Sequence, residues 1–339
     1  MKPETLNFEP ETLNLLTRFS EKTVLVLGDF FLDEYLLLDR TLSETSLETG
    51  LEAYQVIERR VSPGAAGTVA ANLRALGAKV IAMGVIGDDG HGFELRRALS
   101  AQDINITDLL IAPARVTPTY TKPMMREPDG TIHELNRLDT KNRTPLPYNI
   151  PPKLVARLWH WATMVDAIVV GDQVTEPVGG VVNGTLRAAL EELGRTERLI
   201  MVDSRARGNL FRNVILKLNA AEATRAAGQS TPDAAARTLS AQTGKPVFVT
   251  TGEKGIWVAT RRETVAVAGV SVPPPIDPVG AGDATIAALA LALSSGASPT
   301  EAAALANLAA AVTVRKIGTT GTATPAEILE MAAFAHPAA

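Results

Sequence analysis

The sequence predicts an α/β protein with a doubly wound, mostly parallel sheet, helices on both of its faces and a small β-sheet lid. Residues 23–28 form an uninterrupted apolar run ending in glycine, which is typical of a central parallel strand buried on both faces. Further apolar strands alternate with helical patterns, as in right-handed β-α-β units. Two extended regions, about 34–61 and 112–139, break this alternation. We therefore expect one domain over residues 1–339, with these two regions inserted as the lid.

The elements follow from apolar periodicity and from turn residues. Strands are expected at 23–28, 53–61, 79–86, 117–125, 131–138, 167–171, 199–203, 214–218 and 246–251, with a hairpin over 256–268. Helices are expected at 9–19, 65–76, 90–99, 153–161, 177–193, 231–242, 281–293, 300–316 and 325–334. Thr175 is the expected N-cap of the helix that begins at Pro177.

Composition excludes several classes of function. Lys and Arg number 33 and Asp and Glu 37, so the net charge is −4, and no basic stripe suggests a nucleic-acid partner. The chain has no cysteine, which excludes disulfides, thiolate nucleophiles and cysteine zinc sites. The first 22 residues lack the basic start and apolar block of a secretory signal, and no apolar run approaches the ~20 residues of a membrane span. We expect a cytoplasmic protein with no membrane partner.

The segment Gly280-Ala281-Gly282-Asp283 opens a long apolar helix. Small residues let a ligand approach the backbone, and the first N–H groups of a helix lack internal partners at the positive end of its dipole. Such a turn suits the charge that develops on a transferring phosphoryl group. Asp283, in the same turn, could accept the proton of an attacking hydroxyl. Taken alone, the pattern equally fits a glycine-rich loop with an N-capping aspartate.

The wider string Asp277-Pro-Val-Gly-Ala-Gly-Asp283-Ala-Thr-Ile-Ala-Ala-Leu-Ala resembles the signature of the PfkB carbohydrate kinases, which have a ribokinase-like fold. The resemblance implies an ATP-dependent sugar kinase that uses Mg²⁺. It implies that Asp283 is the general base and that Gly280, Ala281 and Gly282 form the anion hole. It also implies a potassium site near Asp277.

Two further segments resemble the cofactor-binding parts of the same family. Asn219-Ala-Ala-Glu222 is similar to the Asn-x-x-Glu motif that organises Mg²⁺ and phosphate, with Glu222 acting through water. An Asn followed by Glu three residues later also forms a capping box. Around the nucleotide, the resemblance implies contacts from the turn after residue 250 and from a late helix, namely Thr251, Gly252, Gly255 and Asn307.

The acceptor side resembles the heptose 7-phosphate kinases within this family. The resemblance rests on Gly28-Asp29-x-x-Leu32-Asp33-x-Tyr35, Thr121-Lys122 and Asn136-Arg137-Leu138-Asp139, and it implies contacts to a sugar or sugar phosphate. The implied contact residues are Asp29, Asp33, Gly64, Thr68, Lys122, Arg137 and Asp172. Cations such as Lys122 and Arg137 suit a phosphorylated acceptor, although they equally fit a solvated lid. Ala65 and Thr68 stand where the family has Gly and Asn, so the identity of the sugar stays open.

Other functions remain as alternatives. A dinucleotide-binding oxidoreductase requires Gly-x-Gly-x-x-Gly after the first strand, and a Walker-type NTPase requires Gly-x-x-x-x-Gly-Lys-Ser/Thr; the sequence has neither. A kinase of another sugar, resembling ribokinase or fructokinase, and a sugar-binding pseudokinase both stay open. Related lids pair into dimers, and apolar residues at Tyr54, Val56 and Ile57 lead us to expect a homodimer through the lid.

Overall fold

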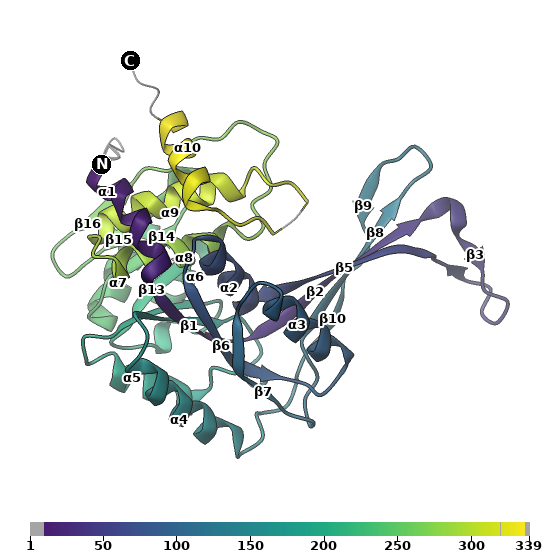
Figure 1. Ribbon diagram of the computed structural model, residues 1–339, viewed down its shortest axis with the longest axis horizontal. Coiled ribbons are helices and arrows are strands. Elements are labelled where there is room, and N and C mark those ends of the chain that lie inside the picture. Colours follow the sequence, from purple (N-terminus) through teal and green to yellow (C-terminus); the bar gives the residue numbers. More distant parts are fainter. Residues whose placement is uncertain (1–9, 319, 336–339) are drawn as a thin grey trace.

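In the computed structural model, which describes residues 10–318 and 320–335, a nine-stranded sheet forms the body of the molecule (Figure 1). Its strand order is β16-β15-β14-β13-β12-β11-β1-β6-β7, with all neighbours parallel except two pairs, β14–β15 and β15–β16. The strands are β1 (Thr23–Gly28), β6 (Lys79–Ile86), β7 (Asn105–Ile111), β11 (Ala167–Asp172), β12 (Leu199–Ser204), β13 (Ile215–Asn219), β14 (Val247–Thr250), β15 (Ile256–Ala259) and β16 (Thr264–Val267). The expectations for residues 1–9, 319 and 336–339 lie outside the described residues.

Helices cover both faces of this sheet, which confirms the predicted fold class. One apolar core lies under α2, α3, α8, α9 and α10, and the other lies under α4 to α7. The helices are α1 (Pro10–Asn14), α2 (Ala66–Ala75), α3 (Gly90–Ser100), α4 (Ile150–Ala162), α5 (Gly184–Leu193), α6 (Ala220–Ala227), α7 (Pro232–Thr243), α8 (Ala281–Ser294), α9 (Pro299–Thr313) and α10 (Pro325–Ala335). Short 3-10 turns span Leu15–Glu21, Arg40–Leu42, Gly208–Leu210 and Gly252–Lys254.

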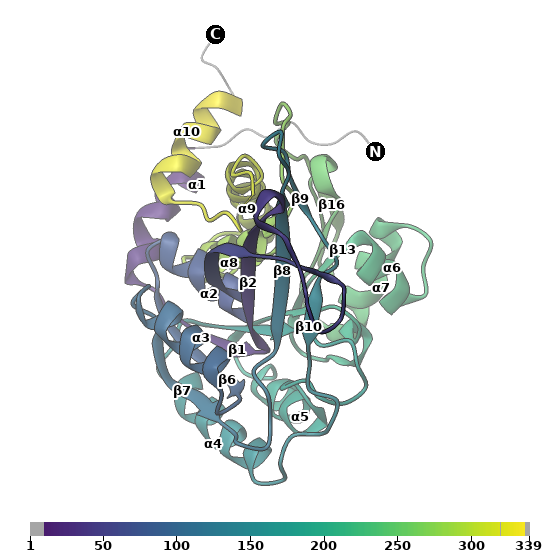
Figure 2. The same ribbon diagram turned by 90° about the vertical axis from the view of Figure 1, so that its right-hand side faces the viewer.

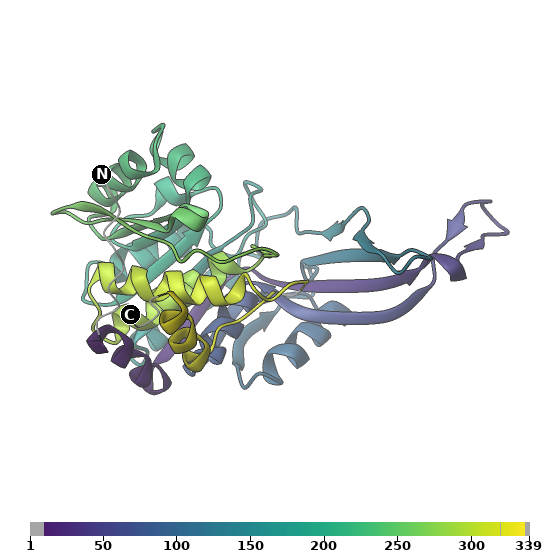
Figure 3. The same cartoon turned by 90° about the horizontal axis from the view of Figure 1, so that it is seen from above.

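The two extended regions form a second sheet that projects from the body as a long arm (Figures 1 and 3). Its order is β10-β8-β2-β5, and β9 pairs with β8. The strands are β2 (Phe30–Asp39), β5 (Val56–Ala65), β8 (Thr119–Arg126), β9 (Ile132–Glu134) and β10 (Leu138–Thr140), with β3 (Glu44–Thr45) and β4 (Glu52–Ala53) pairing near the tip. The end-on view in Figure 2 shows β2, β8 and β10 side by side, in the order in which they pair.

One expected helix begins later than its sequence pattern suggested. The segment expected as helix from Pro177 with Thr175 as N-cap is a loop, and α5 begins at Gly184 with Asn183 as its N-cap. The Asn183 side chain accepts the N–H of Leu186 at 3.1 Å. The loop before it has another function, because its backbone N–H groups bind the buried carboxylate of Asp29.

The topology gathers polar side chains at one edge of the body sheet. Parallel strands β12 and β13 end there with Asp203, Ser204 and Asn219, and α8 begins beside them. The carboxyl edge of a parallel sheet is where open α/β folds bind ligands. In the described part of the chain, no helix has both the length and the apolar character needed to cross a membrane.

Candidate active site

The first turn of α8 is shaped by glycine. Gly280 has φ of 83°, and a Cβ there would lie 2.6 Å from Cγ2 of Thr320, so a side chain is excluded on both counts. The N–H of Ala281 donates to the carbonyl of Pro278 at 3.2 Å. Over residues 10–318 and 320–335, the N–H groups of Gly280 and Gly282 find no acceptor. The anion hole expected over residues 280–282 therefore offers two open backbone donors, from the glycines.

Asp283 lies in the same turn, half-buried, among groups of both charges. Burial raises the pKa of its carboxyl to about 7, and the Asp203 and Asp33 carboxylates add to this rise. Lys217 and Arg205 act in the opposite direction. A carboxyl with a pKa near neutrality is matched to accepting a proton at physiological pH.

Lys217 and Asp203 form a buried ion pair that the sequence reasoning missed. They are register partners on β13 and β12, both nearly inaccessible, with Lys217 Nζ 2.7 Å from Asp203 Oδ2. Burial by itself lowers the pKa of Lys217, but Asp203, helped by Asp283 and Glu222, raises it above its ordinary value. The available signal was a charged residue inside an otherwise apolar strand, which is seldom tolerated without a partner.

Asn219 and Glu222 form a reciprocal capping box at the start of α6. Asn219 Oδ1 accepts the N–H of Glu222, and Glu222 Oε2 accepts the N–H of Asn219, both at 2.9 Å. Burial raises the pKa of Glu222, and the nearby Asp203 adds to this rise. Among the described residues, Glu222 Oε1 accepts no hydrogen bond, so this oxygen stays available to a cation or to water.

A cavity of about 320 Å³ lies beside the same helix start. Its walls are mostly apolar, and they come from the turn after β14, the loop after β16, and helices α8 and α9. Of the residues expected at a nucleotide, Gly252, Gly255 and Asn307 line it. Asn307 donates to the carbonyl of Ala268 at 2.7 Å and so fixes the loop that forms one wall.

Thr251, which was also expected at the nucleotide, does not line the cavity. Its hydroxyl donates to the carbonyl of Gly255 at 2.8 Å and closes the turn, whereas its neighbour Thr250 lines the cavity. Gly255 is required there because its φ is 93° and a Cβ would lie 2.1 Å from the carbonyl oxygen of Val267. The turn thus shapes the cavity through its backbone.

Asp33 lies where the arm joins the body, close enough to Asp283 to influence its pKa. Its carboxylate leans over Gly64, where a Cβ would lie 2.8 Å from Asp33 Oδ1. Lys122 Nζ lies 3.4 Å from Asp33 Oδ2 and 3.0 Å from the Tyr35 hydroxyl. Burial raises the pKa of Asp33, although Lys122 opposes the rise. The structure thus brings Asp33, Gly64 and Lys122 together.

Cations form a row across the same face of the arm. Arg60, Tyr35 and Lys122 are register partners on β5, β2 and β8. Lys122 Nζ lies 4.6 Å from the centre of the Tyr35 ring. Arg137 lies over the Tyr120 ring, 4.2 Å from its centre, and acts on Asp33 electrostatically. Arg60, Tyr35 and Lys122 lie about 7 Å farther along the arm than Asp33, whereas Tyr120, under Arg137, is the register partner of Asp33.

Asp29 and Asp172 are occupied within the protein. Asp29 is buried and accepts backbone N–H groups from Gln173, Val174 and Val181 at 2.7–3.1 Å. Burial raises the pKa of Asp29 to about 6, against the effect of these donors. Asp172 is fully buried, and its carboxylate accepts from Ser204 and Arg207. Both carboxylates therefore hold loops in place, and a sugar contact from either one stays a prediction.

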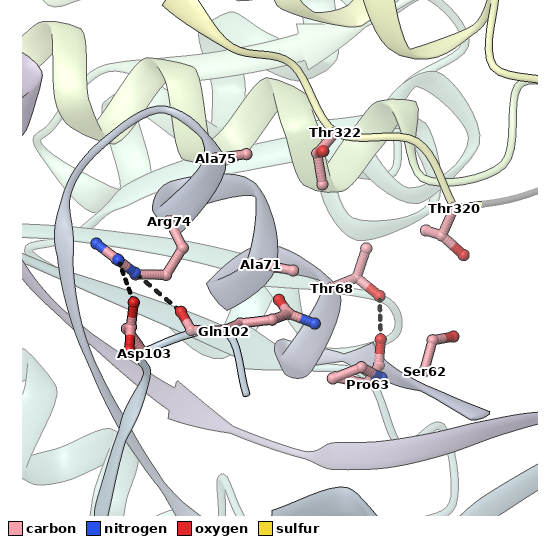
Figure 4. A pocket seen from close by; sticks show the side chains of 10 residues that line it. All are labelled: Ser62, Pro63, Thr68, Ala71, Arg74, Ala75, Gln102, Asp103, Thr320 and Thr322. Atoms are coloured by element: carbon pink, nitrogen blue, oxygen red, sulfur yellow. Dashed lines mark hydrogen bonds and ion pairs between the residues drawn. The ribbon is translucent and has the colours of Figure 1, made fainter. Parts of the chain in front are cut away.

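Thr68 also has an internal partner. Its hydroxyl donates to the carbonyl of Pro63 at 3.2 Å, as the dashed line in Figure 4 shows. The pocket drawn there runs along α2 toward the loop that carries Thr320 and Thr322 (Figure 4). Thr68 therefore braces the end of β5, which carries Gly64, and a sugar contact from Thr68 stays a prediction.

Asp277 ties the start of α8 to the loop after α9. Its Oδ1 accepts the N–H of Val279 at 3.0 Å and its Oδ2 accepts that of Gly318 at 3.1 Å. Each oxygen thus accepts one backbone N–H and retains a further acceptor position. Elsewhere in the described residues, no group of three or more His, Cys, Asp or Glu is arranged to hold a metal.

The chain is similar in sequence and in fold to known carbohydrate kinases. The pfkB family carbohydrate kinase model matches residues 39–327. The bifunctional protein HldE of Geobacter metallireducens is 30% identical over 333 residues, 95% of this chain and 65% of the relative. The chain therefore spans about two thirds of the length of such relatives. Its fold is similar to that of Escherichia coli phosphofructokinase-2 in complex with potassium, with a TM-score of 0.70 and 17% identity over 93% of this chain and 98% of the other.

A second solved structure has the same fold. Arabidopsis thaliana ribokinase complexed with ribose and ATP gives a TM-score of 0.66 at 18% identity, over 92% of this chain and 98% of that one. At such identities these likenesses show the fold alone, whereas the family match covers most of the chain. This chain belongs to the pfkB family of carbohydrate kinases and is a phosphotransferase of the sugar kinase class.

Proposed function

We propose that the protein transfers the γ-phosphoryl group of ATP to a hydroxyl of a sugar or sugar phosphate, with Asp283 as general base. The acceptor oxygen forms a bond to the γ-phosphorus while the bond from that phosphorus to the β,γ-bridging oxygen breaks. ADP leaves with that electron pair, and the hydroxyl proton passes to Asp283. The observation that carries this proposal is the position of Asp283, in the turn with open glycine N–H groups, beside the cavity and near Asp33.

The nucleotide is proposed to lie in the cavity between the loop after β16 and α9, with its phosphates directed toward Gly280 and Gly282. The mostly apolar walls suit a purine ring, and Gly252, Gly255 and Asn307 shape them. Ala281 contributes its place in the turn more than its N–H, which already has an acceptor.

Magnesium is proposed to be organised by Glu222 and Asn219, through water. Glu222 Oε1 accepts no hydrogen bond from the described residues, and the Asn219 side chain lies beside this carboxylate. Mg²⁺ prefers oxygen ligands and keeps several waters, so this donor set fits it. When bound, the metal would neutralise charge on the phosphates. Potassium dependence at Asp277 stays a prediction. Each of the two carboxylate oxygens of Asp277 accepts one backbone N–H.

The acceptor is proposed to bind between Asp33 and the cationic row of the arm. A carboxylate such as Asp33 accepts hydrogen bonds from sugar hydroxyls. Lys122, about 7 Å farther out along the arm, and Arg137, over the Tyr120 ring, suit a phosphate on the acceptor. This arrangement supports a sugar phosphate, and the resemblance of these segments to heptose 7-phosphate kinases makes a heptose 7-phosphate the first acceptor to test.

Steady-state assays with ATP, Mg²⁺ and an acceptor panel test the proposal. The panel should contain free pentoses and hexoses, hexose 6-phosphates and heptose 7-phosphates, with ADP release as the readout. Turnover of a phosphorylated acceptor supports the proposed site. Turnover of free sugars alone favours a kinase resembling ribokinase or fructokinase. Nucleotide binding without turnover of any acceptor favours the pseudokinase alternative.

Replacement of Arg137 by Met is expected to lower kcat/KM for a phosphorylated acceptor by about 10- to 100-fold, because one charge-assisted hydrogen bond is lost. Turnover of the unphosphorylated analogue should change by less than about threefold. Arg126→Met is the matched control, since Arg126 lies on the same strand as Lys122 but farther from the body, at the end of β8. Equal losses for both acceptors would remove the phosphate contact from the proposal.

We further propose a homodimer formed through the arm. The part of the arm farthest from the body exposes Leu47, Leu51, Tyr54, Val56 and Ile57 to solvent. Apolar side chains gathered at one end mark an association surface.

The cytoplasmic location also stays a prediction.

Sedimentation velocity at micromolar concentration is expected to show a dimer that Leu51→Glu converts to monomer. Leu329→Glu, on the exposed side of α10, is the control and should stay dimeric. A monomeric parent protein at that concentration would contradict the proposed dimer.

A further inference from the structure

The ammonium of Lys217 faces the first turn of α8. A Cβ on Gly282 would lie 3.0 Å from Lys217 Nζ, so the cation sits against the first turn of α8. This is the positive end of the helix dipole, where cations are destabilising and anions are favoured. Asp203 contacts the ammonium directly, and the Asp283 and Glu222 carboxylates also stabilise its charge.

Two sets of unused donors meet at this point. An ammonium has three N–H donors, and among the described residues Lys217 Nζ has one hydrogen-bond acceptor, Asp203. The N–H of Gly282 likewise has no acceptor in the described ranges. With bonds of about 1.5 Å along N–Cα–Cβ, the Gly282 nitrogen and Nζ are at most about 6 Å apart. One oxygen that accepts both hydrogen bonds at about 2.9 Å spans that separation.

We propose that Lys217 is a catalytic residue that donates through Nζ to an oxygen of the γ-phosphoryl group, together with the N–H of Gly282. The inference rests on the proposed function, because it places the γ-phosphoryl group at the start of α8. Asp203 is a positioning residue that aims the ammonium through their 2.7 Å contact. Lys217 stays protonated throughout and takes no part in the proton transfer to Asp283.

The burial of the pair strengthens this role. Both side chains are nearly inaccessible, so water screens the ammonium poorly and its attraction for a phosphoryl oxygen is large. Asp203 fixes the ammonium before the nucleotide arrives, and a preorganised cation costs little reorganisation in the transition state. A Cβ at position 282 would lie 3.0 Å from Nζ, so a side chain there would displace the ammonium slightly from this place.

The test compares how tightly Mg·ATP and Mg·ADP bind, measured by calorimetry. In Lys217→Met, ATP is expected to bind about 10- to 100-fold more weakly, whereas ADP affinity stays within about threefold, since only ATP carries the contacted group. Lys217→Arg should restore part of the ATP affinity. Lys153→Met, on the exposed face of α4, is the control for loss of a lysine and should change neither affinity.

Lys217→Met leaves Asp203 without its partner and could prevent folding. The double variant Lys217→Met/Asp203→Asn removes both charges and should show the same selective loss of ATP affinity. Equal weakening of ATP and ADP, or no weakening, would overturn the assignment and leave Lys217 a structural ion pair. A parent protein that binds neither nucleotide would instead overturn the proposed function itself.

Discussion

Asp283→Asn is expected to lower kcat by about 10²- to 10⁴-fold, because the acceptor hydroxyl loses its general base. The affinity for Mg·ATP should stay within a fewfold of the parent value, since the base acts mainly in the transition state. Asn keeps the shape of the side chain and its position in the first turn of α8. Single-turnover kinetics with saturating acceptor separate this chemical defect from any defect in binding.

The pH dependence of kcat/KM is a second test of Asp283 as the general base. The base must be ionised, and the pKa of Asp283 is about 7 because of burial. As the pH falls below 7, the ionised fraction drops, so kcat/KM should fall about tenfold for each pH unit. In Asp283→Asn this inflection should disappear from the residual activity. Asp88→Asn, an exposed carboxylate change, is the control and should keep both the rate and the profile. Near-normal turnover by Asp283→Asn would remove Asp283 from the mechanism.

The sequence predicted the fold class and the start of α8 because both depend on local patterns. Apolar strands that alternate with helices specify the layered sheet. Gly280 and Asp283 lie within one turn, so their proximity follows from chain geometry alone. The reciprocal hydrogen bonds of Asn219 and Glu222 likewise join residues that are close in the sequence, so a sequence pattern can predict them.

The remaining parts of the site depend on pairing that a single sequence does not reveal. Lys217 and Asp203 meet because β12 and β13 adopt a particular register. The helix expected from residue 177 begins only at Gly184, and in the segment before it Asp29 binds the N–H of Val181, which competes with helix formation. Sequence spacing could not tell Asp29 from Asp33, since both follow the same strand.

Asp33→Asn and Asp29→Asn are expected to fail in different ways. Asp33→Asn should lower kcat/KM for the acceptor by about 10²- to 10³-fold and leave ATP affinity unchanged. The reason is that the carboxylate accepts hydrogen bonds from sugar hydroxyls at both oxygens, whereas one end of the amide can only donate. In Asp29→Asn, an amide replaces the carboxylate that accepts hydrogen bonds from three backbone N–H groups, and the NH₂ end of that amide cannot accept them. It should lower Tm by roughly 2–10 °C, with a small effect on the acceptor KM. The reverse pattern would place the sugar at Asp29.

Gly64→Ala tests the same site without changing any charge. Its Cβ would lie 2.8 Å from Asp33 Oδ1 and 3.3 Å from Oδ2, so the carboxylate must turn away from its place over the backbone. The methyl group cannot itself remove a hydrogen bond to a sugar. A rise in acceptor KM of about tenfold or more in Gly64→Ala, with ATP affinity and Tm nearly unchanged, would therefore show that the direction of the Asp33 carboxylate matters. An unchanged KM alongside a large Asp33→Asn defect would mean that Asp33 acts through its charge, by holding Lys122, and not as a hydrogen-bond acceptor for the sugar.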